Sequence, residues 1–197
     1  MQCEETGSKF CRRPDHPILE FNPTTSSWSY WLWDNEDDKF LVNRYQFGAC
    51  LDKSRIYITG GIQITDVGVC TYPGINPVVV LCTTTKTVIQ KIHLGDWGLK
   101  LAHHSFTMRP SHITSSVKEF LIFGGSLPEP SKEPVADKLQ KSKNIYWITI
   151  NNGIANMKTQ EVPQDLRDKI GVCGATSHWF DNNHVVITGE NNHESKL

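Results

Sequence analysis

The stretch Arg55-Ile-Tyr-Ile-Thr-Gly-Gly61 decides the fold, because the chain repeats its pattern twice more. The copies are Glu119-Phe-Leu-Ile-Phe-Gly-Gly125 and His184-Val-Val-Ile-Thr-Gly-Glu190. The first glycines of the three stretches, Gly60, Gly124 and Gly189, are spaced by 64 and then 65 residues. Short runs of β-branched and aromatic residues favour β-strands, and near-equal spacing indicates a structural repeat. The pattern therefore predicts three strands that each end where glycine lets the backbone turn sharply.

The composition indicates a protein without a nucleic-acid or membrane partner. The 197 residues carry 20 basic and 21 acidic side chains, a formal net charge of −1, whereas such partners need a clustered basic excess. The polar N-terminus has no signal-peptide core, and the longest apolar run, Val78–Cys82, is far shorter than the roughly 20 residues of a membrane helix. Six cysteines without a Cys-x-x-Cys pair indicate reduced thiols, so we expect a cytoplasmic protein, with the nucleus as the alternative.

Further strands surround the glycine-ended ones. A strand from Ile18 meets the turn cluster Asn22-Pro-Thr-Thr-Ser-Ser27 and returns at Trp28. The runs 77–82 and 144–150 each turn back, the second through Asn-Gly, to form hairpins with 87–92 and 157–162. Small-residue strands precede the glycine-ended ones, and we place them at 44–51, 109–116 and 171–176. Each period then holds about four short strands.

The connections are expected to be irregular. We predict an acidic loop at 34–39, longer loops at 65–76, 95–104 and 126–143, and no long helix. His103 and His104 fall in one of these loops and are expected to be solvated. In the aromatic cluster, alternation places Trp31 and Trp33 on one face and Tyr30 on the other, for packing between sheets or as an exposed patch for a partner.

The order of these elements resembles the kelch repeat: an apolar strand ends at Gly-Gly, an aromatic strand follows, and an Asn-Pro-x-Thr-like turn leads into Trp. Kelch repeats form four-stranded blades of β-propellers, with a period of about 50 residues. The residues that match the repeat signature are Gly60, Gly61, Gly124, Gly125, Gly189 and Trp28. The chain departs from the pattern at Glu190, and at Val88 and Met157, which stand where the family has Trp.

The resemblance implies an all-β fold, a kelch-type β-propeller of four-stranded antiparallel blades in an incomplete ring of about three blades. The expected parts are a flexible arm (1–15), a half blade (16–33), blades at 44–92 and 109–162, a second half blade (170–190) and a tail (191–197). Propellers typically have 4–8 blades. We therefore expect either a fragment of a longer propeller or a homodimer that completes the ring.

Three arginines each precede the strand that the resemblance makes innermost in its blade. The predicted partner-binding residues are Arg44, Arg109, Arg167 and His112. Guanidinium groups bind carboxylates in a bidentate manner, and three of them would surround one mouth of a central channel and hold an acidic peptide. The alternative is that each arginine binds backbone carbonyls or an acidic loop residue.

Motifs for catalysis are missing from the sequence. Adjacent strand histidines point to opposite faces, and there is no zinc spacing, nucleophile elbow or phosphate-binding glycine loop. We therefore expect no catalytic residue, no metal and no cofactor, and predict a protein that is not an enzyme. The resemblance implies a protein–protein interaction module, such as a scaffold, a cytoskeletal binder or a substrate-recognition subunit of a ubiquitin ligase. The alternatives are a kelch-fold enzyme, either sugar-modifying or a copper oxidase that would use residues such as Cys70 and Tyr72, and a self-assembling structural subunit.

Overall fold

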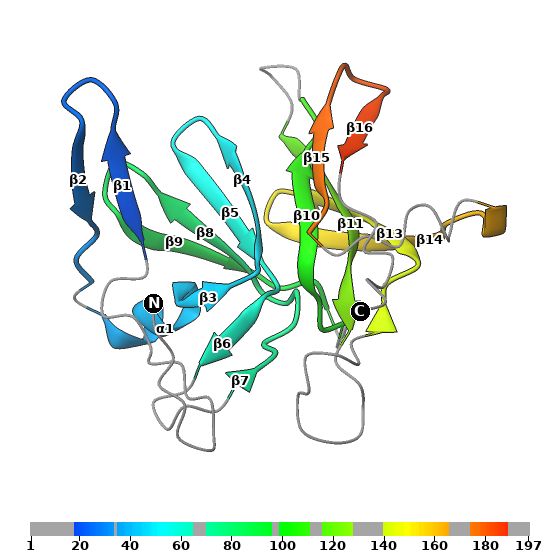
Figure 1. Ribbon diagram of the computed structural model, residues 1–197, viewed down its shortest axis with the longest axis horizontal. Coiled ribbons are helices and arrows are strands. Elements are labelled where there is room, and N and C mark those ends of the chain that lie inside the picture. The colour runs from blue at the N-terminus through cyan, green and yellow to red at the C-terminus, as the bar shows by residue number, and fades with distance from the viewer. Residues whose placement is uncertain are drawn as a thin grey trace, which may run out of the picture.

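The computed structural model describes residues 18–33, 35–64, 70–95, 99–110, 116–127, 140–165 and 174–188 (Figure 1). These residues form sixteen strands and one helix, and all strand pairs are antiparallel, so the predicted all-β class is confirmed. The one helix of the described part, α1 (Glu36–Val42), is too short and too polar to cross a membrane.

The first glycine-ended strand lies in a four-stranded sheet. Its strands, in spatial order, are β4 (Gly48–Asp52), β5 (Arg55–Thr59), β8 (Val78–Cys82) and β9 (Thr87–Ile92). The predicted hairpin of 77–82 with 87–92 is therefore confirmed. The strand expected at 44–51 is interrupted, because Gln46 has φ +57° and the chain bends there. Its first part, β3 (Arg44–Tyr45), joins a separate sheet with β6 (Ile62–Ile64) and β7 (Cys70–Thr71).

The second glycine-ended strand lies in a five-stranded sheet. Four strands, β10 (Ala102–Met108), β11 (Val117–Leu127), β13 (Asn144–Asn151) and β14 (Ile154–Glu161), follow one another, and β12 (Gln140–Lys141) also pairs with β11. The first strand of this sheet is β10, which ends at Met108, and Arg109, Pro110 and Ser116 are not in a strand, contrary to the prediction. Residues 111–115 of the strand expected at 109–116 lie outside the described residues. Pro110 has no N–H for a ladder, whereas 102–108 supplies the side chains that the core buries.

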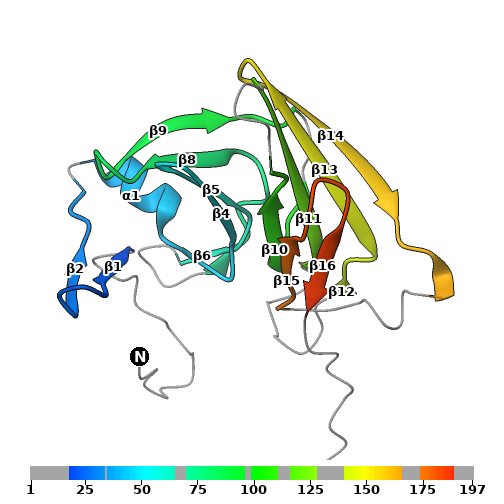
Figure 2. The same ribbon diagram turned by 90° about the horizontal axis from the view of Figure 1, so that it is seen from above.

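The first and last strands of the described residues form two-stranded sheets, β1 (Leu19–Asn22) with β2 (Ser27–Tyr30), and β15 (Thr176–Trp179) with β16 (Val185–Thr188). The sheets follow one another in chain order like an opened fan, with β4 and β10 toward the middle and β9 and β14 at the periphery (Figure 2). The repeat-signature residue Gly189 lies outside the described residues.

Residues 36–39 of the acidic loop expected at 34–39 instead form the start of helix α1. The Asn35 side-chain oxygen accepts hydrogen bonds from the backbone N–H groups of Asp37 and Asp38, at 2.9 and 3.3 Å. An Asn N-cap and carboxylates in the first turn both stabilise a helix N-terminus. The acidic residues that indicated a loop are therefore the residues that begin the helix.

The first complete sheet has a hydrophobic cluster on each face. One cluster fills the space between the two complete sheets and includes Tyr57, Val80 and Phe120, whose rings or methyl groups are at most 2% exposed. A second cluster covers the other face of the first sheet with Trp31 and Val42. Burial on both faces explains why β8 is an uninterrupted apolar run rather than an alternating one. As predicted, Trp31 and Trp33 lie on one face and pack together, at 6.1 Å between ring centroids, while Tyr30 is exposed.

The glycines of the repeat allow the segment 101–104 to lie close to Gly60, at the end of β5, and to Gly125 in β11. A Cβ added to Gly60 (φ +63°) would lie 2.4 Å from His104 Cε1 and 2.5 Å from the Leu101 carbonyl oxygen. A Cβ added to Gly125 (φ +91°) would lie 2.8 Å from the Ala102 carbonyl oxygen. The Gly61 N–H donates to the Leu101 carbonyl at 2.8 Å. The carbonyl that leaves no room for a side chain at Gly60 therefore also accepts a hydrogen bond from the next residue.

Candidate functional site

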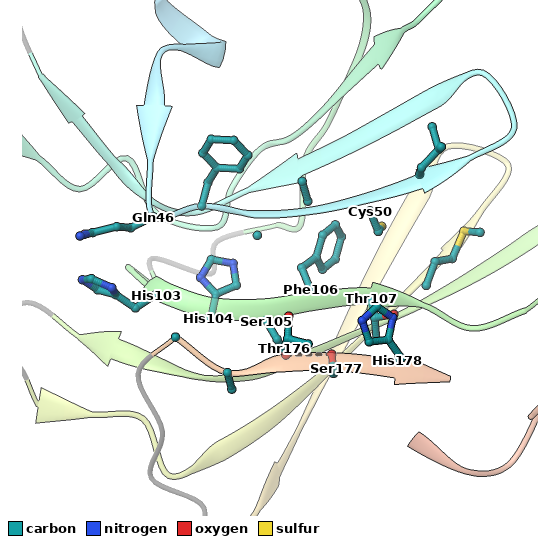
Figure 3. Close-up of a pocket in the computed structure, with 17 residues that line it drawn as sticks. Gln46, Cys50, His103, His104, Ser105, Phe106, Thr107, Thr176, Ser177 and His178 are labelled. Atoms are coloured by element: carbon teal, nitrogen blue, oxygen red, sulfur yellow. Dashed lines mark hydrogen bonds between the residues drawn. The ribbon is translucent and has the colours of Figure 1, made fainter. Parts of the chain in front are cut away.

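Three strands from three successive sheets lie side by side and form a groove. Strand β10 packs between β4 and β15, and the cavity among them has a volume of about 790 Å³. We call it the inner-strand groove (Figure 3). Its lining comes from the segments 46–51, 103–108 and 174–178. The groove thus belongs to no single sheet and depends on how the sheets are packed.

None of the described residues that line the groove is Asp, Glu, Lys or Arg. Its polar groups are hydroxyls, imidazoles and one amide, interspersed with apolar side chains such as Phe106. Ser105 and Ser177 hydrogen-bond through their hydroxyls at 2.9 Å, and this bond joins β10 to β15. Hydroxyls both donate and accept hydrogen bonds, so this wall suits neutral polar groups rather than an ion.

His103 fixes the three strands relative to one another. Its N–H donates to the Gln46 carbonyl and its carbonyl accepts from the Gly174 N–H, both at 2.8 Å. It has φ +56°, a left-handed conformation that costs a residue with a Cβ about 1–2 kcal/mol and persists where surrounding contacts enforce it. The half-buried ring lies beside the Gln46 side chain at one end of the groove (Figure 3). Burial lowers the pKa of His103, which favours the neutral imidazole.

His104 lines the groove from β10, with its ring packed against Gly48 and Gly60. The expectation of a solvated histidine was wrong, since only 5% of the residue is exposed. Neither ring nitrogen makes a hydrogen bond of ordinary geometry. Burial lowers the pKa of His104 to about 4, an effect that the nearby Thr59 backbone opposes only weakly. The ring is therefore neutral at pH 7 and acts as a packing group that requires glycine on both sides.

The two predicted partner-binding arginines that can be placed lie outside the groove. Arg44 is 6% exposed and donates from Nε to the Leu41 carbonyl (2.7 Å) and from NH1 to the Gly60 carbonyl (3.1 Å). Burial lowers its pKa to about 10. These contacts match the alternative of an arginine that binds backbone carbonyls.

Arg109 is also engaged by the chain itself. It pairs with Glu119 at 2.8 Å, donates to the Asn182 carbonyl at 2.6 Å and stacks over the Trp179 ring, 5.5 Å from its centroid. Because β10 ends before Arg109 while β4 begins after Arg44, the two arginines are not equivalent in the repeat. Arg167 and His112 lie outside the described residues. A partner-binding role for the four residues stays a prediction.

Sequence reasoning missed the groove residues Gln46, His103, Thr107, Ser177 and His178. The signal in the sequence was weak, because polar side chains on an inner strand look like loop residues when the neighbouring strands are unknown. The alternation of Ala102, His104 and Phe106, all buried, was the pattern that could have revealed β10.

No group of three His, Cys, Asp or Glu side chains that could hold a metal ion occurs within the described part of the chain. The side chain of Cys70, which the copper-oxidase alternative would use, is outside that part. Compared with protein-family models and with curated protein sequences, the chain gives no match. The resemblance to kelch repeats therefore depends on the residues quoted above.

Proposed function

We propose that this chain is a kelch-type recognition module and that the inner-strand groove binds a segment of a protein partner. The observation that carries the proposal is the convergence of inner strands from three successive sheets on one groove of about 790 Å³. The order β4-β5-β8-β9 in the first sheet, with a glycine-ended second strand, supports the kelch resemblance. In propellers, the mouth of the channel between inner strands is a natural binding surface because several loops and strands meet there.

The lining favours an uncharged partner segment. Its hydroxyl, imidazole and amide groups can satisfy backbone N–H and C=O groups of an extended peptide, and Phe106 and Met108 offer apolar contact. An acidic peptide would find no cation among the described lining residues, because Arg44 and Arg109 are occupied elsewhere. The proposed partner segment is therefore neutral and mixed in polarity.

Selection from a random peptide display library against the purified chain tests this function. Thr176 lies in the groove and Thr159 on strand β14 away from it, and both are exposed strand threonines. We expect the selected peptides to bind wild type and Thr159→Arg alike, and to lose at least tenfold in affinity with Thr176→Arg, about 1.4 kcal/mol. Failure to enrich any peptide, or equal binding to Thr176→Arg, would refute the proposal.

A second candidate function, a self-assembling subunit, is favoured by a different observation. The two-stranded sheets at either end of the chain each contain half the strands of the first complete sheet.

A further inference from the structure

The hairpins β1–β2 and β15–β16 correspond to opposite halves of the first complete sheet. Hairpin β15–β16 corresponds to β4–β5, the two inner strands of the first sheet, because both contain an inner strand followed by the strand that leads to the repeat glycine. Hairpin β1–β2 corresponds to β8–β9, the two outer strands of that sheet. Neither hairpin has a further strand neighbour among the described residues, although β5 and β8 pair directly.

The turn geometry identifies β1 with β8 residue by residue. Both hairpins have a four-residue turn whose last residue is left-handed, Ser26 (φ 52°) in one and Lys86 (φ 58°) in the other. In both turns the third residue shares a hydroxyl hydrogen bond with the first residue of the next strand, at 2.7 Å for Thr25 and Ser27 and at 2.8 Å for Thr85 and Thr87. Leu19 and Phe21 therefore correspond to Val79 and Leu81.

The corresponding residues differ sharply in burial. Val79 and Leu81 are 0% exposed, because α1 and the segment around Trp31 cover that face of the first sheet. Leu19 and Phe21 are 64% and 46% exposed, and Trp28, stacked on Phe21 at 4.8 Å between ring centroids, is 68% exposed. On the opposite face of the hairpin, Glu20 forms a partly exposed ion pair, at 2.8 Å, with Lys86 in the turn between β8 and β9. Hairpin β1–β2 therefore has one neighbouring sheet and presents an apolar face where a second would lie.

We infer that β1–β2 of one copy of this chain adds to β16 of a second copy and completes an antiparallel sheet in the order β15-β16-β1-β2. The register follows from the first sheet, where Ile58 pairs with Val79 and Ile56 with Leu81. Counting back from the repeat glycines, the equivalent pairs are Ile187 with Leu19 and Val185 with Phe21. Exposed strand edges are templates for this kind of pairing.

The β1 strand that pairs with β16 belongs to a second copy, because β1–β2 and β15–β16 of one chain lie at opposite ends of the row of sheets (Figures 1 and 2). Two-fold symmetry is the commonest symmetry of soluble oligomers. In a two-fold dimer, β1 of each copy would pair with β16 of the other. Each copy contributes two complete sheets and the two joints add two more, so the ring contains six. Six lies within the usual 4–8 blades of a propeller. The inference does not depend on what the inner-strand groove binds.

Disulfide trapping tests the pairing and its register. We expect Leu19→Cys combined with Ile187→Cys to give a covalent species of twice the chain mass of 22.3 kDa under mild oxidation. The matched control, Leu19→Cys with Val185→Cys, uses the same face of the same strand but is shifted by two residues, beyond the roughly 7 Å that a disulfide spans. Equal trapping in both variants, or a disulfide confined to one chain, would overturn the inference.

Solution mass provides a second, independent measurement. Light scattering after gel filtration should give twice the chain mass for wild type. Phe21→Glu should halve it, while Ile89→Glu should leave it unchanged. Both side chains are 46% exposed, but Ile89 lies on β9, the outer strand of a sheet that is complete within one chain. A monomeric wild type, an open-ended series of masses, or dimers of Phe21→Glu would each contradict the two-fold pair.

Discussion

Substitution of Gly60 by Ala tests whether the repeat glycines are needed for the close approach of β10. The added Cβ would lie 2.4 Å from His104 Cε1 and 2.5 Å from the Leu101 carbonyl oxygen. Real Cβ atoms do not come this close, and the second contact is with backbone, so rotation of a side chain cannot relieve it.

Two effects set the size of the loss. The left-handed conformation at φ +63° costs alanine about 1 kcal/mol net, after the smaller unfolded-state entropy of alanine is taken into account. Overpacking adds about 1–3 kcal/mol. We expect Gly60→Ala to lower the free energy of unfolding by about 2–4 kcal/mol.

Urea denaturation followed by tryptophan fluorescence measures this loss. The matched control is Gly174→Ala, because Gly174 also has positive φ (+77°) but an added Cβ would meet no described atom within 4 Å. The control isolates the conformational cost of about 1 kcal/mol. If Gly60→Ala is no more destabilising than Gly174→Ala, the close approach of β10 to Gly60 is refuted.

Two further predictions concern ionisation. Burial lowers the pKa of His104 from 6.5 to about 4, so the unfolded chain binds more protons than the folded one between these values, and the free energy of unfolding should fall by about 2 kcal/mol between pH 7 and pH 5. Urea denaturation at several pH values should show a smaller dependence of this free energy on pH in His104→Gln than in wild type. An unchanged dependence would contradict the prediction. Hydrogen bonds from Thr85, the side chain first, lower the pKa of Cys82 to about 7, whereas burial raises that of Cys50 to about 12. Iodoacetamide at pH 7.5 should therefore label Cys82 well before Cys50, with Thr85→Val slowing the reaction severalfold by mass spectrometry, and equal labelling of the two thiols would count against the assignment.

Local signals were sufficient for the hairpins. The turn residues Asn22-Pro-Thr-Thr-Ser-Ser27 and the Asn152-Gly153 pair fix which strands become neighbours, because such turns bring together residues only a few positions apart. The apolar runs before Gly60 and Gly124 likewise indicated equivalent strands. These strands, β5 and β11, are each second in the order of a complete sheet. Even here, the diglycine does not end β11, which continues to Leu127.

The amino-acid sequence by itself determined the all-β class and the antiparallel hairpins, since each depends on contacts within a few residues. Only the tertiary structure decided that His104 is buried between glycines, that Arg44 and Arg109 bind their own chain, and that the inner strands enclose a groove. The burial of His104 and the groove depend on contacts between residues more than 40 positions apart in the chain, such as Gly60 with His104 or Ser105 with Ser177. The contacts of Arg44 with Gly60 and of Arg109 with Glu119 span 16 and 10 positions. Side-chain type alone does not encode such distant neighbours, and burial depends on the neighbours.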